Sequence, residues 1–485
     1  MSRALAFGAL AGVVGFLAFV EFTSGVLQGW YTPMLTDIAR HLGVHDADVN
    51  WLEGSQLMLS ALVVPALAKL GDMVGHKRIL LWSTAITAIA SLMLPFADSF
   101  VFFLVAWALQ GVYVVWLPLE IALIWSRSRR MESRSVITAK AAGLLVAALE
   151  LGAIAGALTG GALIDELPLW IVLLIPALLV VVCFFVILFG VKESPDPAGG
   201  RLDLVGLTLI SLALISFTGG LSFLRLSGVG DPLPWALIAL GLVLVWPFAR
   251  WELRHPDPLI DVRMFRSPAL APVFLTAGLF GVSVLGAQAP LSTFARTDPT
   301  VYGYGLGTTG FATSLIIGIY LVAMIAGALT YPIIARRITP RITLMAAAIF
   351  VGVGFLMFLP FHETYAQVIT NMVVVGLGSG ALVAALPAAA ASAAPSHQTS
   401  VATGLTNSVK TVGGAIASCV FGIALINGAV AGGTAAAEGT AGSFSGYLTV
   451  WIVCGVTALI SAVLLALVVP KRAFTDAAAA PTATV

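Results

Sequence analysis

Charged residues are scarce in this chain. Only 10% of its 485 residues are Asp, Glu, Lys or Arg, and 59% are hydrophobic, which gives a mean hydropathy of +1.03. A water-soluble domain usually carries about a quarter charged residues. The composition therefore excludes an ordinary soluble domain and indicates a protein that crosses a lipid bilayer many times. With a net charge of only +1, we expect no nucleic-acid partner.

Cysteines are few, and the common catalytic motifs are absent. Cys183, Cys419 and Cys454 lie inside apolar runs and lack the spacing of a metal site or of a disulfide framework. The sequence contains no H-E-x-x-H zinc motif, no serine-nucleophile motif and no G-x-x-x-x-G-K-S/T phosphate loop. We therefore expect neither an enzyme nor an ATP-driven pump, and neither a cofactor nor a metal ion.

Long apolar runs, in contrast, are abundant. Fourteen of them are long enough to cross a hydrocarbon core of roughly 30 Å as helices. These segments are residues 5–31, 51–70, 79–96, 102–125, 136–163, 169–191, 204–224, 233–249, 269–294, 309–334, 342–361, 365–391, 401–426 and 447–469. The predicted fold class is therefore an all-α membrane protein with fourteen transmembrane helices.

Polar stretches after the sixth and the eighth segment divide the helices into groups of six, two and six. The predicted organisation is a six-helix bundle over residues 1–191 and a linker with two extra transmembrane helices over residues 192–267. A second six-helix bundle follows over residues 268–470. The low-complexity end, residues 471–485, is predicted to be a disordered cytoplasmic tail.

Lys and Arg residues are concentrated in alternate loops. If the N-terminus is cytoplasmic, nineteen of the 24 Lys and Arg residues lie in cytoplasmic segments and three lie in external loops. Basic residues are enriched on the cytoplasmic side of membrane proteins. We therefore predict a multi-pass protein of the plasma membrane with both termini in the cytoplasm.

A weak internal repeat relates the two groups of six helices. After the second helix of each group, Pro65, Ala68 and Arg78 match Pro332, Ala335 and Arg341. Two related bundles that face each other across a central site are a known architecture of secondary transporters.

The segment from residue 140 to residue 163 has two unusual features. Gly152, Gly156 and Gly160 recur every four residues, so one helix face allows another helix backbone to approach closely. Glu150 precedes this face, and an ionised carboxylate in contact with lipid is costly. A membrane-embedded acid beside a glycine face indicates a helix interface next to an aqueous cavity.

The loop between the second and third helices resembles the signature of the major facilitator superfamily, G-x-L-a-D-r-x-G-r-k. Asp72, Gly75 and Lys77 match this pattern, while three other positions depart from it. Gly75 permits a tight turn, and Asp72 can stabilise a helix N-terminus. The resemblance implies a loop that latches the two halves together in one conformation.

A second motif resembles the fifth-helix signature of drug:proton antiporters, G-x-x-x-G-P-x-x-G-G. Gly152, Gly156, Gly160 and Gly161 match, and Ala157 replaces the proline. From this resemblance we expect the glycine face to allow close approach at an interface that changes during transport.

The fourth helix carries Gln110 followed by glycine, similar to the family motif R-x-x-Q-G-x-G. Trp107 occupies the position of the arginine, which the resemblance associates with proton coupling. Residues 258–268 and 402–422 resemble segments of the fourteen-helix drug:proton antiporters. The resemblance thus covers nearly the whole chain.

Ionisable and polar residues within predicted helices are the candidate proton- and substrate-binding groups, because such residues usually face a cavity. They are Glu21, Glu150, Lys410 and Gln110. The alternative for the charged residues is a buried Glu–Lys ion pair that only holds the two halves together.

Three further charged residues lie nearer the ends of helices. We expect Glu53, Glu120 and Lys140 to reach towards the membrane surface or to act as gates, in preference to binding substrate.

These features predict a secondary transporter in which the two bundles rock about a central cavity. The expected activity is export of amphipathic or cationic small molecules, including drugs and secondary metabolites, in exchange for protons. The exchange follows because an arriving cation favours loss of the proton from a buried acid, and a proton favours release of the cation. The expected partners are a small-molecule substrate, protons and the lipid bilayer. We expect a monomer, because one facilitator-type chain contains a complete pathway.

Two alternatives stay open. An uncoupled facilitator or an importer of a small metabolite has the same fold and is favoured by Trp107 and Ala157. A non-transporting membrane sensor is disfavoured because no large soluble signalling domain is attached.

Overall fold

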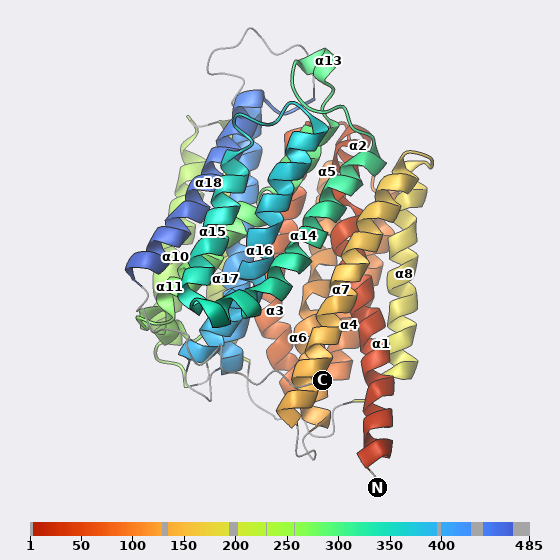
Figure 1. Cartoon of the computed structure of the whole chain (residues 1–485), viewed down its shortest axis with the longest axis vertical. Coiled ribbons are helices and arrows are strands. Elements are labelled where there is room, and N and C mark those ends of the chain that lie inside the picture. Colours follow the sequence, from red (N-terminus) through yellow and green to blue (C-terminus); the bar gives the residue numbers. More distant parts are fainter. Residues whose placement is uncertain are drawn as a thin grey trace.

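The structure, a computed structural model, describes residues 3–128, 134–193, 202–228, 230–256, 258–394, 399–427 and 440–468. Within these residues the regular structure is entirely helical (Figure 1). The predicted tail, residues 471–485, lies outside the described residues. We call the end of the molecule that carries α2, α12 and α13 the upper end, as in Figure 1, and the opposite end the lower end.

The N-terminal half contains α1 to α8. Its helices are α1 (Arg3–Trp30), α2 (Leu35–His41), α3 (Val49–Val74), α4 (His76–Met93), α5 (Phe100–Gln110), α6 (Trp116–Arg127), α7 (Arg134–Ile164) and α8 (Leu169–Gly190). Short 3₁₀ turns are η1 (Thr32–Met34), η2 (Asp46–Asp48), η3 (Leu94–Phe96) and η4 (Gly111–Val115). Because η4 joins α5 to α6, these two helices form a single membrane span, Phe100–Arg127.

A helical hairpin, α9 (Leu204–Ser227) and α10 (Pro232–Glu252), precedes the C-terminal half. That half contains η5 (Val262–Arg266), α11 (Ala271–Val284), α12 (Gln288–Arg296), α13 (Pro299–Tyr302), α14 (Gly310–Arg337), α15 (Pro340–Leu356), α16 (Tyr365–Ala393), α17 (Thr399–Asn427) and α18 (Phe444–Leu467).

The described residues contain twelve spans that are long and apolar enough to cross a membrane. The 28-residue α1 and the 17-residue α15 coincide with the two remaining predicted segments. Fourteen transmembrane helices are therefore compatible with the structure, and the predicted all-α membrane fold is confirmed.

Many of these helices begin at a residue whose side chain accepts a hydrogen bond from a backbone N–H of the first turn. Such capping satisfies a donor that has no partner within the helix. The capping residues include Ser99, Asp203, Thr309, Thr339, Thr364 and Ser443.

Each half has its own hydrophobic core. Apart from Ala289, the buried residues of one core all precede residue 192, and apart from Ala47, those of the other all follow residue 263. The repeated loops also make equivalent contacts. Lys77 Nζ donates to the Leu188 carbonyl oxygen at 2.8 Å, and Arg341 Nε donates to the Leu465 carbonyl oxygen at 3.0 Å. In both halves a basic side chain thus binds the C-terminal turn of the last helix, where cations are favoured.

The glycine face of α7 packs against α1. A Cβ atom on Gly152, Gly156 or Gly160 would collide with main-chain oxygens of α1, and a Cβ on Gly25 or Gly29 would collide with the main chain of α7. The close approach that the glycine spacing predicts is therefore present. This contact lies within the N-terminal half, and the role of the three glycines at an interface that changes during transport stays a prediction.

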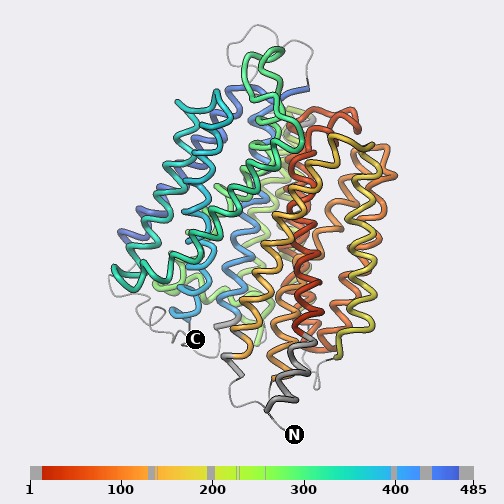
Figure 2. The backbone as a smooth tube through the Cα atoms, turned by 45° about the vertical axis from the view of Figure 1, so that its right-hand side comes forward, coloured from red at the N-terminus to blue at the C-terminus, as the bar shows by residue number. Residues whose placement is uncertain are grey.

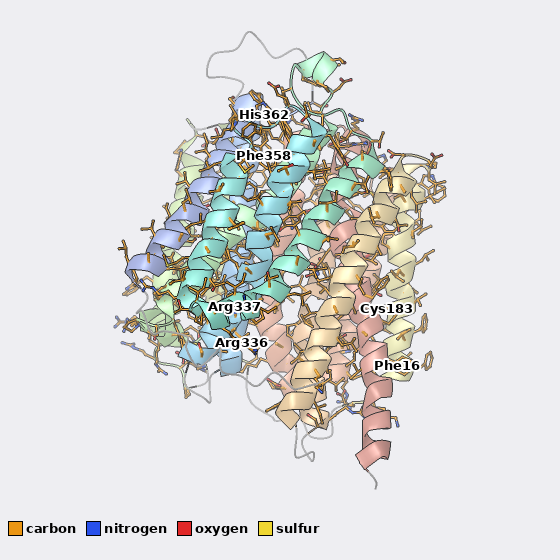
Figure 3. All side chains as sticks on the ribbon, in the orientation of Figure 1. Phe16, Cys183, Arg336, Arg337, Phe358 and His362 are labelled. Carbon is orange, nitrogen blue, oxygen red and sulfur yellow. The ribbon has the colours of Figure 1, made fainter. Side chains whose placement is uncertain are left out.

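Gly161 is the member of the motif that reaches the other half. A Cβ at this position would meet the Gly310 carbonyl oxygen and the Ser314 side chain of α14. The next contact between the two helices is made by Leu158 of α7 and Gly318 of α14, which lies about one helical turn after Ser314. From there α7 and α14 diverge towards the lower end (Figure 2). Arg336 and Arg337 lie at the lower end of α14, well away from α7 (Figure 3).

The extra hairpin covers a seam between the halves. Trp51 of α3, Leu221 of α9 and Cys419 of α17 form a small buried cluster that also contacts α5 and α10. The hairpin therefore contacts both halves and does more than connect them along the chain.

Candidate transport site

Two buried carboxyl groups lie together inside the N-terminal half. Glu21 of α1 and Glu120 of α6 are both 0% exposed, and their carboxyl groups interact. None of their oxygens has a well-formed hydrogen bond to any described residue. Two ionised carboxylates cannot lie side by side away from water without a large cost, so this acid pair requires at least one proton. The expectation that Glu120 reaches the membrane surface is therefore wrong.

The acid pair has polar neighbours on other helices. The Cys183 thiol of α8 interacts with Thr23 and with both acids, and Figure 3 places Cys183 beside α1. Tyr113 of η4 is within electrostatic reach of Glu21 and also of Glu53 on α3. Unlike the acid pair, Glu53 is partly exposed. Tyr113 is thus within electrostatic reach of both the partly exposed acid and the buried pair.

Glu150 and Lys410 lie in opposite halves, within electrostatic reach of each other. Glu150 lies on α7 and Lys410 on α17, both side chains are partly exposed, and the two charges interact electrostatically. Neither forms a direct ion pair or side-chain hydrogen bond within the described part of the chain. Tyr320 of α14 also lies within electrostatic reach of Glu150. This group therefore draws its members from both halves.

Gln110 does not belong to the group of Glu150 and Lys410, because its side chain is buried among residues of the N-terminal half. Its side chain is 0% exposed and its amide nitrogen donates to the Tyr31 hydroxyl at 2.8 Å and to Ser91 Oγ at 2.9 Å. Its amide oxygen accepts from Gln56 at 3.5 Å. All its polar atoms are occupied by protein groups. Of the four predicted site residues, the structure therefore brings together Glu150 and Lys410, and places Glu21 and Gln110 in two other clusters.

Trp107 packs where the family motif has an arginine. The indole is 1% exposed, lies edge-on to Tyr31 at a centroid distance of 4.9 Å and stacks on Phe103 at 5.8 Å. Such aromatic pairs add packing energy in a core. The position carries no cation in this chain.

The signature loop turns at Gly75, whose φ of +119° favours glycine. Asp72 Oδ1 lies 3.0 Å from His76 Nε2 of the same half, and the Asp72 side chain is 58% exposed. The N-terminus of α4 is instead bound by Glu193, which accepts from the backbone N–H groups of Lys77 at 2.9 Å and Arg78 at 3.1 Å. The role expected of Asp72 at a helix N-terminus therefore belongs to Glu193.

We expect Glu193→Ala to lower the free energy of unfolding by about 1 kcal/mol, as loss of a helix cap usually does. Glu193→Gln keeps an acceptor oxygen and should lose less. Thermal unfolding in detergent measures the difference, and equal midpoints for Glu193→Ala and the parent would show that the contact contributes nothing.

A charged clasp joins the halves at the upper end. Arg296 of α12 donates to both carboxylate oxygens of Asp37 on α2, each at 2.7 Å, and its other terminal nitrogen lies 3.8 Å from Asp165, just beyond α7. Asp165 also accepts from the backbone N–H groups of Gly310 at 2.8 Å and Phe311 at 2.9 Å, at the start of α14. We call Asp37, Asp165 and Arg296 the upper clasp. The sequence alone does not reveal this clasp, because Arg296 is only one of three basic residues in the predicted external loops.

The upper clasp thus joins the two halves at the upper end, and α7 and α14 diverge towards the lower end (Figure 2). The sequence model of the Major Facilitator Superfamily matches residues 17–418. The chain belongs to this superfamily. This match confirms the membership that the resemblance of the sequence motifs predicted.

The relatives of this facilitator with curated names include drug exporters. The chain is 29% identical over 352 residues to the multidrug efflux pump LfrA of Mycolicibacterium smegmatis. The aligned residues cover 70% of this chain and 67% of LfrA. It is 27% identical over 410 residues to the puromycin resistance protein pur8 of Streptomyces alboniger, covering 83% of this chain and 78% of pur8. Among solved structures, the nucleoside transporter NupG superposes with a TM-score of 0.64 at 15% identity, covering 94% of this chain and 98% of NupG.

Proposed function

We propose that this facilitator exports amphipathic or cationic small molecules from the cell in exchange for protons. The observation that carries the proposal is the acid pair of Glu21 and Glu120, which lies inside a carrier fold and must bind a proton to be stable there. The names of LfrA and pur8, a multidrug efflux pump and a puromycin resistance protein, support drugs as the substrate class.

The proposed division of labour separates proton binding from substrate binding. The acid pair holds the coupling proton, and Tyr113 and the partly exposed Glu53 connect it to water. Glu150, which is partly exposed and within electrostatic reach of Lys410 in the other half, attracts the cationic part of the substrate. The proton and the cationic substrate bind in alternation, because a cation bound at Glu150 favours the loss of the proton from the acid pair.

The proposed orientation places the lower end in the cytoplasm, together with both termini, and the upper clasp on the external side of the plasma membrane. The arrangement is then an inward-facing one. Rocking of the two halves opens the upper end and brings the lower parts of α7 and α14 together. One chain suffices for this motion, so the working unit is a monomer.

One observation favours a second candidate, an uncoupled facilitator or importer. Trp107 fills the arginine position of the fourth-helix motif with an indole that is 1% exposed. A carrier without proton coupling would still exchange labelled for unlabelled substrate.

The test uses inside-out vesicles with an acidified interior, to which lipophilic cations such as ethidium and tetraphenylphosphonium are added. We expect protein-dependent collapse of the pH gradient with some of these compounds. We expect the rate of collapse to fall at least about tenfold in the double variant Glu21→Gln, Glu120→Gln, since proton transfer by one positioned group is typically worth a factor of about a hundred or more. Exchange of labelled substrate without a gradient should persist.

Glu166→Gln is the control, because Glu166 is an exposed acid in the α7–α8 connection. Unchanged collapse in the double variant would remove the acid pair from the mechanism. Substrate exchange without any collapse in the parent protein would establish the uncoupled facilitator instead.

A further inference from the structure

Two further buried carboxyl groups lie where the chain enters and leaves the extra hairpin. Asp203 immediately precedes α9 and Glu252 is the last residue of α10, and the two residues are only 3% and 1% exposed. Both side chains reach the same glycine. A Cβ atom on Gly206 would lie 2.3 Å from Glu252 Oε1 and 2.6 Å from Asp203 Oδ2. The two oxygens are therefore close to each other, and we call Asp203 and Glu252 the hairpin pair.

Asp203 has the surroundings of an ionised carboxylate. Its Oδ1 accepts from the backbone N–H of Gly206 at 2.8 Å, and both of its oxygens accept from Trp251 Nε1 at 3.0 Å. His255 Nδ1 lies 3.9 Å from Asp203 Oδ2, and the imidazole stacks on the Trp251 indole at a centroid distance of 5.8 Å. Hydrogen bonds donated to a carboxylate stabilise its charged form.

Glu252 has the surroundings of a protonated acid. Its Oε2 accepts from the backbone N–H of Ile260 at 3.3 Å, but its Oε1 is buried and has no hydrogen bond to any described residue. An ionised Oε1 would be a buried acceptor without a donor, next to a second negative charge. A protonated Oε1 is a donor instead, and Asp203 Oδ2 is the acceptor beside it. One proton thus satisfies both oxygens.

We propose that Asp203 and Glu252 bind one proton between them, and that this proton holds the end of the hairpin together. Glu252 also accepts from Ile260, so the pair fixes the segment through which the chain leaves the hairpin for the C-terminal half. Without the proton, two like charges are left together away from water. Glu252 then turns away from Asp203 and releases Ile260.

The other charged groups at this end of the hairpin are His255, Asp261 and Arg263. His255 lies beside Asp203, and Arg263 Nη2 donates to the Leu253 carbonyl oxygen at 2.9 Å. Asp261 accepts from the backbone N–H of Arg263 at 3.1 Å. Of these three, only His255 has an ordinary titration range near neutral pH, so its contribution is tested separately.

The polar stretches on either side of the hairpin, residues 192–203 and 250–268, belong to the predicted cytoplasmic segments. The hairpin pair therefore exchanges its proton with the cytoplasm, and a rise in internal pH loosens the connection between the hairpin and the C-terminal half. This site is separate from the acid pair of Glu21 and Glu120, and the inference does not depend on the proposed export activity.

The first test is infrared spectroscopy of the purified chain in lipid nanodiscs, as a difference between about pH 6 and about pH 9. Exposed carboxyl groups are already ionised above about pH 6, so the C=O band of a protonated carboxyl group that disappears in this range reports a retained proton. We expect Glu252→Gln to remove one such component from the parent spectrum. Asp203→Asn should move its loss to lower pH, because the neighbouring like charge is gone.

The second test is hydrogen exchange of the segment that contains the Ile260 N–H, corrected for the intrinsic effect of pH on exchange. In the parent we expect exchange to be at least about tenfold faster at the higher pH, because a lost hydrogen bond allows local opening. Glu252→Gln keeps an acceptor without a charge and should exchange slowly at both pH values. His255→Gln should keep the pH dependence of the parent.

A matched pair of glycine variants separates the hairpin pair from a general effect on α9. Gly206→Ala places a Cβ where the two carboxyl oxygens lie, and this segment should exchange fast at both pH values. Gly219→Ala, on the same helix, places a Cβ that meets nothing within 4 Å, and should behave like the parent.

An unchanged carboxyl band in Glu252→Gln, or the same pH dependence of exchange in this variant and the parent, would overturn the inference. Loss of the pH dependence in His255→Gln would assign the effect to the imidazole instead. Exchange that responds to added sodium at constant pH would assign the place of the proton to a metal cation. Drug-driven collapse of a pH gradient in vesicles is a separate measurement, so either proposal can fail without the other.

Discussion

Replacing Gly152 with leucine is expected to prevent α7 from packing on α1, whereas Gly143→Leu on the same helix leaves the fold intact. A Cβ at Gly152 would collide with the Phe22 carbonyl oxygen and lie 3.1 Å from the Phe22 Cα. A Cβ at Gly143 would meet nothing within 4 Å, and this residue is exposed. Adding volume where side chains can adjust costs about 1–3 kcal/mol. Here the obstacle is main chain on both helices, so we expect at least the upper end of this range.

The measurement is the yield of monodisperse protein in detergent and its thermal unfolding midpoint. We expect Gly152→Leu to be recovered poorly or to unfold at a much lower temperature. Gly143→Leu should equal or slightly exceed the parent, because leucine favours a helix more than glycine does. Equal midpoints for the two variants would mean that α1 and α7 are not held in backbone contact.

The outcome for α7 illustrates what a repeat of small residues can and cannot predict. The four-residue spacing of Gly152, Gly156 and Gly160 fixes a face of the helix and predicts a close neighbour. It contains no information about which helix that neighbour is. The spacing was therefore read correctly as a packing face, but the partner is α1, from the same half, and only Gly161 reaches α14.

Glu120 shows a second limit, which comes from local geometry. Its place near the end of the fourth span suggests a side chain that reaches the membrane surface. Between α5 and α6, however, η4 (Gly111–Val115) is a 3₁₀ turn, and such a turn advances about 3.0 residues per turn compared with 3.6 in an α-helix. The direction in which a side chain of α6 points therefore cannot be extrapolated from the helical periodicity of α5. In the structure Glu120 lies next to Glu21.

Contacts between distant residues are the third limit. The apolar runs predicted the twelve spans found in the described residues, because length and hydropathy are local properties of the sequence. Glu150 and Lys410 could be named as candidate binding residues because both lie inside such runs. Arg296 and Asp37 are 259 residues apart and lie at the rim, where charged residues are common. Nothing in their local sequence distinguishes them from other surface charges.

The upper clasp leads to the second large effect, a shift of the conformational equilibrium in Arg296→Asp. Arg296 makes two charge-assisted hydrogen bonds to Asp37, and its side chain is only 10% exposed. These bonds join α12 to α2 across the two halves, and we expect them to break when the upper end opens. Removing one partner of such a pair typically costs about 2–5 kcal/mol. An aspartate here adds repulsion from Asp37 and Asp165.

We therefore expect Arg296→Asp to increase the ratio of open to closed upper ends by roughly 30-fold or more, since about 1.4 kcal/mol is a factor of ten. Transport should fall with it, because a carrier held open on one side cannot complete its cycle. Adding Asp37→Arg restores opposite charges and should recover much of the closed population.

The control is Arg40→Asp. Arg40 lies 3.9 Å from the same Asp37, but its side chain is 59% exposed, and exposed pairs contribute only about 0–1 kcal/mol. In Arg40→Asp we expect the ratio of molecules with an open upper end to molecules with a closed one to stay within a few-fold of that of the parent. The contrast between Arg296 and Arg40 separates the closing contact from a general change of charge at the rim.

Spin labels at cysteines introduced at Leu167 and Val301 report the opening. These residues are 36% and 64% exposed and belong to opposite halves near the upper end. The native Cys183, Cys419 and Cys454 are buried, so background labelling should be low. A longer label separation in Arg296→Asp, reversed by Asp37→Arg, establishes the clasp as a gate. An unchanged distance distribution together with unchanged transport would show that the upper end is closed by apolar packing of α3 on α17 and α7 on α14 alone.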